Sequence, residues 1–195
     1  MVDRDARLRP GRVDDPSVLA ELVDYAGEGL PSYLWSKMAA PSETAKQVGQ
    51  NRAARETGSF SCRNATVIEH EGRAAGALIG CAIPESPEPI APDMPAMFVP
   101  LQELENLAPG TWYVNVLAVL PEYRGSGLGT ALLEFAEKTA RTLGRHGMSV
   151  IVSDANKGAR RLYERVGYRE LARRKMVKED WTNDGQEWVL LTKAL

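Results

Sequence analysis

The chain has 195 residues, of which 44% are hydrophobic and 26% charged, and its formal net charge is −2. This length suits one domain with a substantial core, and the scattered, balanced charges give no reason to expect a nucleic-acid partner. No apolar stretch approaches the ~20 residues that span a bilayer, and residues 1–15 lack the apolar centre of a signal peptide, so a cytoplasmic protein without a membrane partner is expected.

The N-terminal part predicts an edge strand followed by helices. Residues 6–12 can form the strand. Asp15 directly before Pro16 predicts a helix start, because Asp is a preferred N-cap residue and Pro suits the first helical position. The apolar and aromatic segment Leu30–Ala39 predicts a short helix, and a helix of weaker amphipathicity is expected over 42–56.

A hairpin and a long connector follow. Thr66–Glu69 and Ala75–Ile83 favour strands, with a plausible tight turn between them at residues 71–72. Residues 84–110 hold seven of the twelve prolines, which excludes a regular strand or long helix over most of the segment; residues 101–107 can make one or two helical turns. A connection of this length is functional or disordered, so two interpretations stand: a solvated connector, or a lip over a substrate cleft.

An apolar run, a glycine-rich turn and a periodic helix come next. Tyr113–Leu120 is nearly continuous in apolar or β-favouring residues, which predicts a strand buried on both faces, and Pro121 ends it. From Leu128 to Leu143 apolar residues recur at spacings of three and four, which predicts a helix with one buried face.

The turn before this helix predicts an anion site. The first turn of a helix has N–H groups without intrahelical partners and a partial positive charge, so an oxyanion or pyrophosphate is a natural ligand. Glycines 125, 127 and 129 allow the backbone to approach such a ligand closely and permit positive φ.

Two nucleotide-binding motifs are excluded by spacing. A Walker loop requires GxxxxGK[ST], which the chain lacks. A dinucleotide fingerprint requires GxGxxG and a downstream acidic residue; Thr130 stands at the third glycine position, and the following strand, MSVIV, carries no acid.

The remaining elements complete a mixed fold. Met148–Val152 predicts a short buried strand, Asn156–Val166 a helix, and Tyr168–Val177 with Gln186–Leu191 an antiparallel hairpin. The chain therefore predicts an α/β (α+β) architecture over residues 1–195, in which helices flank a mixed, largely antiparallel central sheet.

Two motifs within residues 111–168 resemble those of the GNAT superfamily of N-acetyltransferases. The first is the acetyl-CoA motif, Arg124-x-x-Gly127-x-Gly129 after a strand. The second, at the expected distance and in the expected order, is Asn156-x-x-Ala159-x-x-Leu162-Tyr163-x-x-x-Gly167-Tyr168. The resemblance implies the GNAT fold and acetyl-CoA as co-substrate.

The resemblance also implies roles for individual residues. Tyr163 matches the tyrosine beside the coenzyme sulfur and is the expected general acid, and Asn156 is expected to bind the pantetheine arm or its neighbours. Backbone groups on the strand before the turn would hold the pantetheine, and the amide of Leu117 would stabilise the oxyanion. The expected coenzyme contacts on the strand and turn are Leu117, Ala118, Val119, Arg124, Gly125, Ser126, Gly127, Leu128, Gly129 and Thr130.

No general base is evident. The strand positions where family members often carry Glu or His hold Tyr113 and Asn115, and neither is an obvious base at neutral pH. Deprotonation can pass through an ordered water, or a carboxylate can reach in from elsewhere; Glu28, between two glycines, and Asp154, which also suits a turn or helix cap, are the alternatives considered.

The predicted function is direct transfer of an acetyl group from acetyl-CoA to a primary amine of a small molecule or peptide, without a covalent acyl-enzyme. The alternative is an acyl-CoA-binding module that is catalytically silent and acts as a sensor or partner surface. Two cysteines and two histidines without ligand spacing predict no metal site, and exposed hairpin edges make a homodimer plausible.

Overall fold

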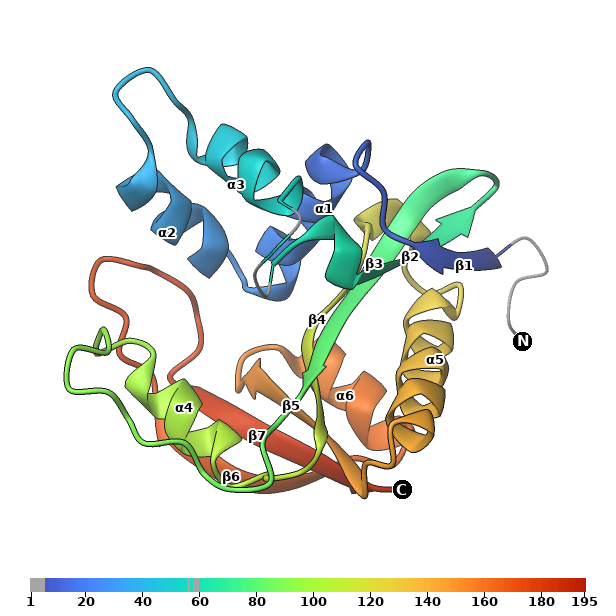
Figure 1. Cartoon of the computed structure of the whole chain (residues 1–195), viewed down its shortest axis with the longest axis vertical. Helices are drawn as coiled ribbons and strands as arrows, with labels where there is room; N and C mark the ends of the chain where they lie inside the picture. The colour runs from blue at the N-terminus through green and yellow to red at the C-terminus, as the bar shows by residue number, and fades with distance from the viewer. Residues whose placement is uncertain (1–5, 56, 58–59) are drawn as a thin grey trace. The chain divides into compact units, whose positions relative to one another are not determined.

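The computed structural model describes residues 6–55, 57 and 60–195. Its elements carry the same labels in Figure 1. The strands are β1 (Ala6–Pro10), β2 (Ala65–His70), β3 (Arg73–Ala82), β4 (Trp112–Val119), β5 (Gly147–Ser153), β6 (Arg169–Lys175) and β7 (Glu187–Ala194). The helices are α1 (Pro16–Ala26), α2 (Leu30–Met38), α3 (Ala45–Ala53), α4 (Val99–Glu105), α5 (Leu128–Thr142) and α6 (Lys157–Arg165), with short 3-10 turns η1 (Cys62–Asn64) and η2 (Pro121–Tyr123).

The strands follow the order β1-β2-β3-β4-β5-β7-β6. The pairs β1–β2, β2–β3, β5–β7 and β6–β7 are antiparallel, and β4–β5 is parallel. The predicted α/β fold with a mixed, largely antiparallel sheet is therefore confirmed. The chain groups into two compact units, Met1–Gly80 with Val116–Leu133 and Cys81–Asn115 with Glu134–Leu195, which are described in turn.

The first unit contains the predicted hairpin. The turn between β2 and β3 has positive φ at Glu71 (50°) and Gly72 (76°), the conformation of a two-residue hairpin turn. Helices α1, α2 and α3 pack on one another. The core that they share with the strands of this unit includes Leu19, Leu22, Trp35, Val48, Val67, Ile79 and Val116.

The start of α1 is as predicted, but the Asp15 side chain has a different role there. Helix α1 begins at Pro16 as expected, but the prediction that Asp15 caps it with its side chain is wrong. The Asp15 carboxylate instead pairs with both terminal nitrogens of Arg9, at 2.7 and 2.8 Å, and accepts from the Arg12 N–H. A two-pronged pair between two ions is stronger than a single bond from a neutral backbone N–H to the carboxylate, which explains the outcome.

The start and the length of α3 differ from the prediction. Helix α3 is shorter than the predicted 42–56, because Thr44 and Gln47 form a capping box at its start; Glu56, at the end of the predicted span, lies outside the described residues.

The second unit is built around β5. Strand β5 runs parallel to β4 at Trp112 and Tyr113 and antiparallel to β7 along its whole length. The Thr111 hydroxyl donates to the carbonyl of Ala108 and also contacts the Ser149 hydroxyl at 2.8 Å in the interior. This pair of hydroxyls connects the end of the proline-rich connector to the middle strand.

The proline-rich connector is anchored at both ends within the second unit. The amide side chain of Asn106 accepts from the Glu88 N–H at 2.9 Å and donates to the Glu88 carbonyl at 2.8 Å. The Gly110 N–H donates to the Pro84 carbonyl at 2.9 Å. The predicted helical turns are present as α4, which packs on β5, β6 and β7. Most residues between 84 and 96 are exposed.

Candidate active site

The glycine-rich turn lies in the first unit between η2 and α5. Gly125 and Gly127 have φ of 82° and 88°, a region in which L side chains are strained. A Cβ built on Gly125 meets no atom within 4 Å, so at this position the backbone angle, not crowding, requires glycine. Gly129 already lies inside α5.

The start of α5 presents backbone donors. The first bond of the helix runs from the Ala131 N–H to the Gly127 carbonyl at 3.1 Å, so the N–H groups of residues 128–130 precede the helical ladder. Leu128 is 1% exposed and anchors this end of the helix in the core. Arg124 and Gly125 are exposed. The arrangement can bind an anion at an accessible helix N-terminus.

Side chains of the turn stabilise its own backbone. The Arg124 Nε donates to the Val119 carbonyl at 3.0 Å, and its guanidinium lies 5.6 Å from the centre of the Tyr25 ring. The Ser126 hydroxyl donates to the Tyr123 carbonyl. The Arg124 charge is therefore held at the turn, whereas the Ser126 hydroxyl is already used; toward a ligand, Ser126 offers its backbone N–H.

The strand before the turn approaches β3 closely. A Cβ on Gly76 would lie 2.7 Å from the Ala118 carbonyl oxygen, so only glycine permits this distance. Ala118 is buried, whereas Leu117 and Val119 are only partly buried. Residues 117–119 thus present alternating faces, and the carbonyl of Val119 is engaged by Arg124.

Tyr163 lies in the second unit, on α6, and is 3% exposed. Its ring meets that of Tyr168 edge to face, and the Tyr168 hydroxyl lies 3.7 Å from the Met148 sulfur. Burial raises the pKa of Tyr163 above its ordinary value. The phenol is therefore neutral at physiological pH and carries a proton that it can donate.

Asn156 is the N-cap of α6. Its Oδ1 accepts from the Ala159 N–H at 3.0 Å, which stabilises the start of the helix. The side-chain oxygen is used locally, and the Nδ2 donor is the part that can face a ligand.

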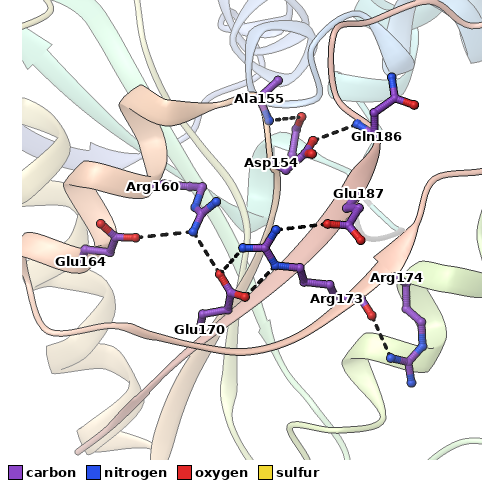
Figure 2. A network of polar contacts seen from close by, with 10 residues as sticks. Asp154, Ala155, Arg160, Glu164, Glu170, Arg173, Arg174, Gln186 and Glu187 are labelled. Carbon is purple, nitrogen blue, oxygen red and sulfur yellow. Dashed lines mark hydrogen bonds and ion pairs between the residues drawn. The ribbon is translucent and has the colours of Figure 1, made fainter.

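Asp154 has a structural role. Its Oδ1 accepts from the Gln186 N–H at 2.8 Å (Figure 2). Partial burial acts to raise the pKa of Asp154, but bonds from the backbone of Gln186, Glu187 and Ala155 outweigh it and hold the pKa below its usual value. The carboxylate joins the start of α6 to the start of β7, and its low basicity makes it a poor proton acceptor.

Charged residues of α6, β6 and β7 form a separate surface network (Figure 2). Arg160 lies between Glu164 and Glu170, at 3.7 and 3.0 Å. Arg173 bridges Glu170 and Glu187, at 2.6 and 3.1 Å. The network connects α6, β6 and β7, and burial alone, with none of these charges, accounts for the raised pKa of Tyr163.

A family model described as the acetyltransferase (GNAT) family matches residues 27–168. The chain belongs to the GNAT family. The match includes the glycine turn, Asn156 and Tyr163.

Individual relatives are more distant. An uncharacterized N-acetyltransferase of Methanocaldococcus jannaschii is 37% identical over 68 residues, which cover 35% of this chain and only 28% of that protein. A GNAT family acetyltransferase from Elizabethkingia anophelis, solved with acetyl-CoA bound, is similar with a TM-score of 0.62 at 14% identity, over 99% of this chain and 100% of that one. A mosquito arylalkylamine N-acetyltransferase like 5b has a TM-score of 0.66 at 19% identity, over 97% and 100%. At these identities the solved structures show a shared fold.

In this GNAT chain the structure describes each residue considered as a base. Asn115 is exposed and has no basic group. Tyr113 is buried, and burial, followed by the charge of Glu105, raises its pKa well above the ordinary value, so it is a neutral phenol. Glu28 lies in the turn between α1 and α2 with a φ of 52°. Neither strand position supplies a base.

Glu105 is a further titratable residue of interest that no sequence motif marks. This residue ends α4, is half-buried, and has a pKa raised to about 6 by burial and then by Glu88. The sequence shows two glutamates in this helix, Glu103 and Glu105, and only the side-chain environment separates them.

Among the residues that the structure describes, no cluster of three or more metal-binding side chains occurs. Cys62 and Cys81 are both free thiols. No helix in the described ranges combines the length and the apolar character that crossing a bilayer requires.

Proposed function

We propose that the protein is an acetyl-CoA-dependent N-acetyltransferase that moves the acetyl group directly to a primary amine of a small molecule or peptide. The observation that carries the proposal is the accessible glycine turn at the N-terminus of α5, with positive φ at Gly125 and Gly127, inside a GNAT match that spans residues 27–168. In this proposal, residues 1–195 form one acetyltransferase domain. Its proposed location is the cytosol.

The coenzyme contacts in this proposal use backbone more than side chains. The N–H groups of residues 125–130 receive the pyrophosphate, because a helix N-terminus favours negative charge, and Arg124 adds a cation held by the Val119 carbonyl. Backbone groups of residues 117–119 and the Nδ2 of Asn156 are assigned to the pantetheine arm. The acetyl-CoA bound in the Elizabethkingia anophelis relative supports the choice of thioester.

Tyr163 is assigned the proton transfer to the leaving thiolate. The neutral amine nitrogen attacks the thioester carbonyl, the C–N bond forms and the C–S bond breaks, and the thiolate takes the Tyr163 proton. The nitrogen loses one proton, and Tyr163 regains one through solvent. A phenol with a raised pKa is a weak acid in water, but the same dry surroundings raise the proton affinity of the thiolate as well. The reaction therefore needs close contact more than an acidic donor.

A second candidate is a coenzyme-binding module without catalysis. The absence of a carboxylate or imidazole at Tyr113 and Asn115 favours it, whereas a buried, neutral Tyr163 argues for chemistry, since a pure binder has little need of a proton donor at the sulfur.

Calorimetry with acetyl-CoA and a thiol-release assay over a panel of primary amines separate the two candidates. The enzyme requires binding together with turnover on at least one amine. Binding without turnover on any amine supports the module. If acetyl-CoA does not bind, both candidate functions are wrong.

A further inference from the structure

Several titratable side chains lie around Tyr113 in the second unit, and a role for them in catalysis rests on the proposed acetyl transfer. Glu105, Cys81 and Tyr163 all raise the pKa of Tyr113 through their charges, after the dominant effect of burial. These residues come from α4, β3 and α6, so the fold brings three other elements close to the β4 tyrosine.

Glu105 differs from the other carboxylate on its helix. Glu103 pairs with the Arg174 guanidinium of β6 at 2.5 Å. The influences on Glu105 are burial and the like charge of Glu88, with no hydrogen bond and no cation among them. Within the described residues, Glu105 is thus a half-buried carboxylate without a counter-ion, and an uncompensated buried charge needs a reason.

Several contacts hold Glu105 in place. Asn106, the next residue, is bonded to both backbone groups of Glu88. The Ala108 N–H donates to the Glu105 carbonyl at 3.0 Å. These bonds hold the end of α4 against the connector, so the backbone that carries the Glu105 side chain is fixed.

We propose that Glu105 is the general base that accepts a proton from the acceptor ammonium group, directly or through one water. The ammonium nitrogen loses two protons in the reaction: Glu105 takes one and releases it to solvent, and the other balances the proton that Tyr163 gives to the thiolate and regains. Glu105 and Tyr163 both lie near enough to Tyr113 to raise its pKa, so the base and the acid belong to one cluster of side chains.

The charged and titratable groups around Glu105 suit this role. Glu88 of the connector opposes its ionisation, the Cys81 thiol has a pKa raised by desolvation and then by Glu105 itself, and the phenols of Tyr113 and Tyr163 are neutral. Glu103 is neutralised by Arg174. A carboxylate with a pKa of about 6 is ionised at pH 7 yet more basic than an ordinary glutamate.

The test measures kcat/KM against pH for the full chain, with the amine that gives the highest turnover. In the unmodified protein we expect activity to fall as pH drops through about 6. Glu105→Gln should lose about a hundredfold in kcat at pH 8 and lose this limb of the profile, whereas acetyl-CoA affinity by calorimetry stays unchanged. Glu103→Gln, two residues away on the same helix, is the matched control and should keep both the rate and the limb.

Three outcomes would overturn the proposal. One is a Glu105→Gln variant that binds acetyl-CoA and turns over within about threefold of the parent rate; another is a parent profile with no ionisation near pH 6. The third outcome applies if Glu105→Gln does not fold, in which case Glu105→Asp is measured because it keeps a carboxylate. This variant should retain the acid limb of the pH profile with a reduced kcat. A flat pH profile for Glu105→Asp contradicts the assignment. Failure of the enzyme proposal itself is distinct, because it shows as no turnover with any amine in the parent protein.

Discussion

The ring of Tyr163 meets the ring of Tyr168 edge to face, with centroids 5.3 Å apart and planes inclined by 63°. Aromatic pairs in this geometry contribute about 0.5 to 1.5 kcal/mol beyond burial, so each ring restricts the orientation of the other. The direction of the Tyr163 hydroxyl is thereby set by Tyr168.

Removing the Tyr163 hydroxyl should separate chemistry from binding. We expect Tyr163→Phe to lower kcat by about 10²- to 10⁴-fold, since general acid catalysis contributes this much, with little change in acetyl-CoA affinity. Steady-state thiol release and calorimetry measure the two effects. Tyr168→Phe is the control, because it keeps the ring pair and loses only the contact with the Met148 sulfur; unchanged turnover in Tyr163→Phe would remove this residue as the acid.

The backbone of the glycine turn should be essential for coenzyme binding. Gly127→Val forces a β-branched residue into a φ of 88°, and we expect acetyl-CoA binding to be lost by calorimetry. Gly144→Val, at the other end of α5 with a φ of 67° and open space around it, carries similar strain and should still bind. Tight binding by the Gly127 variant would contradict the assignment of the turn.

The two halves of the Asn156 side chain can be tested apart. Asn156→Ala removes the cap of α6 and should cost about 1 kcal/mol of stability, measured by urea unfolding. Asn156→Asp keeps the capping oxygen but loses the amide donor, so it should preserve stability and weaken acetyl-CoA binding. Equal affinity for the coenzyme in Asn156→Asp and the parent would confine Asn156 to a structural role.

The raised pKa of Glu105 also predicts an effect on stability. A carboxyl whose pKa rises from 4.5 to about 6 on folding stabilises the fold fully below its unfolded pKa and loses this contribution as pH rises through about 6. Such a shift is equivalent to about 2 kcal/mol, and screening at a half-buried group reduces the expected effect to about 1 kcal/mol.

Glu105→Gln cannot ionise, so it should be more stable than the parent at pH 8 and similar to it at pH 4. Urea unfolding at the two pH values measures the difference. A variant less stable at pH 8 would show that the ionised carboxylate has a stabilising partner.

The elements with strong local signals were predictable from the sequence. The apolar run before Pro121, the periodic helix from Leu128 and the hairpin turn at Glu71 and Gly72 each depend on neighbours along the chain. The structure has them within a few residues of the predicted bounds. Their patterns also carried the family resemblance, because the glycine turn and the Asn156 motif are local as well.

The errors and omissions involve partners distant in sequence. Asp15 fits a helix cap by local rules, but Arg9 on β1 takes its carboxylate. Gly76 is unfavourable in a strand by β propensity, but the close approach of the Ala118 carbonyl requires it. Glu105 could not be told from Glu103 without knowing which one Arg174 would neutralise.

The pair of hydrogen bonds between the Asn106 side chain and the Glu88 backbone has a consequence for how the connector can vary. The Asn106 side-chain amide satisfies both the N–H and the carbonyl of Glu88, as the backbone of a neighbouring strand would do. Insertions or deletions between residues 89 and 96 therefore need not disturb the two anchored ends. The chain can change the length and chemistry of this exposed segment while α4 keeps its register.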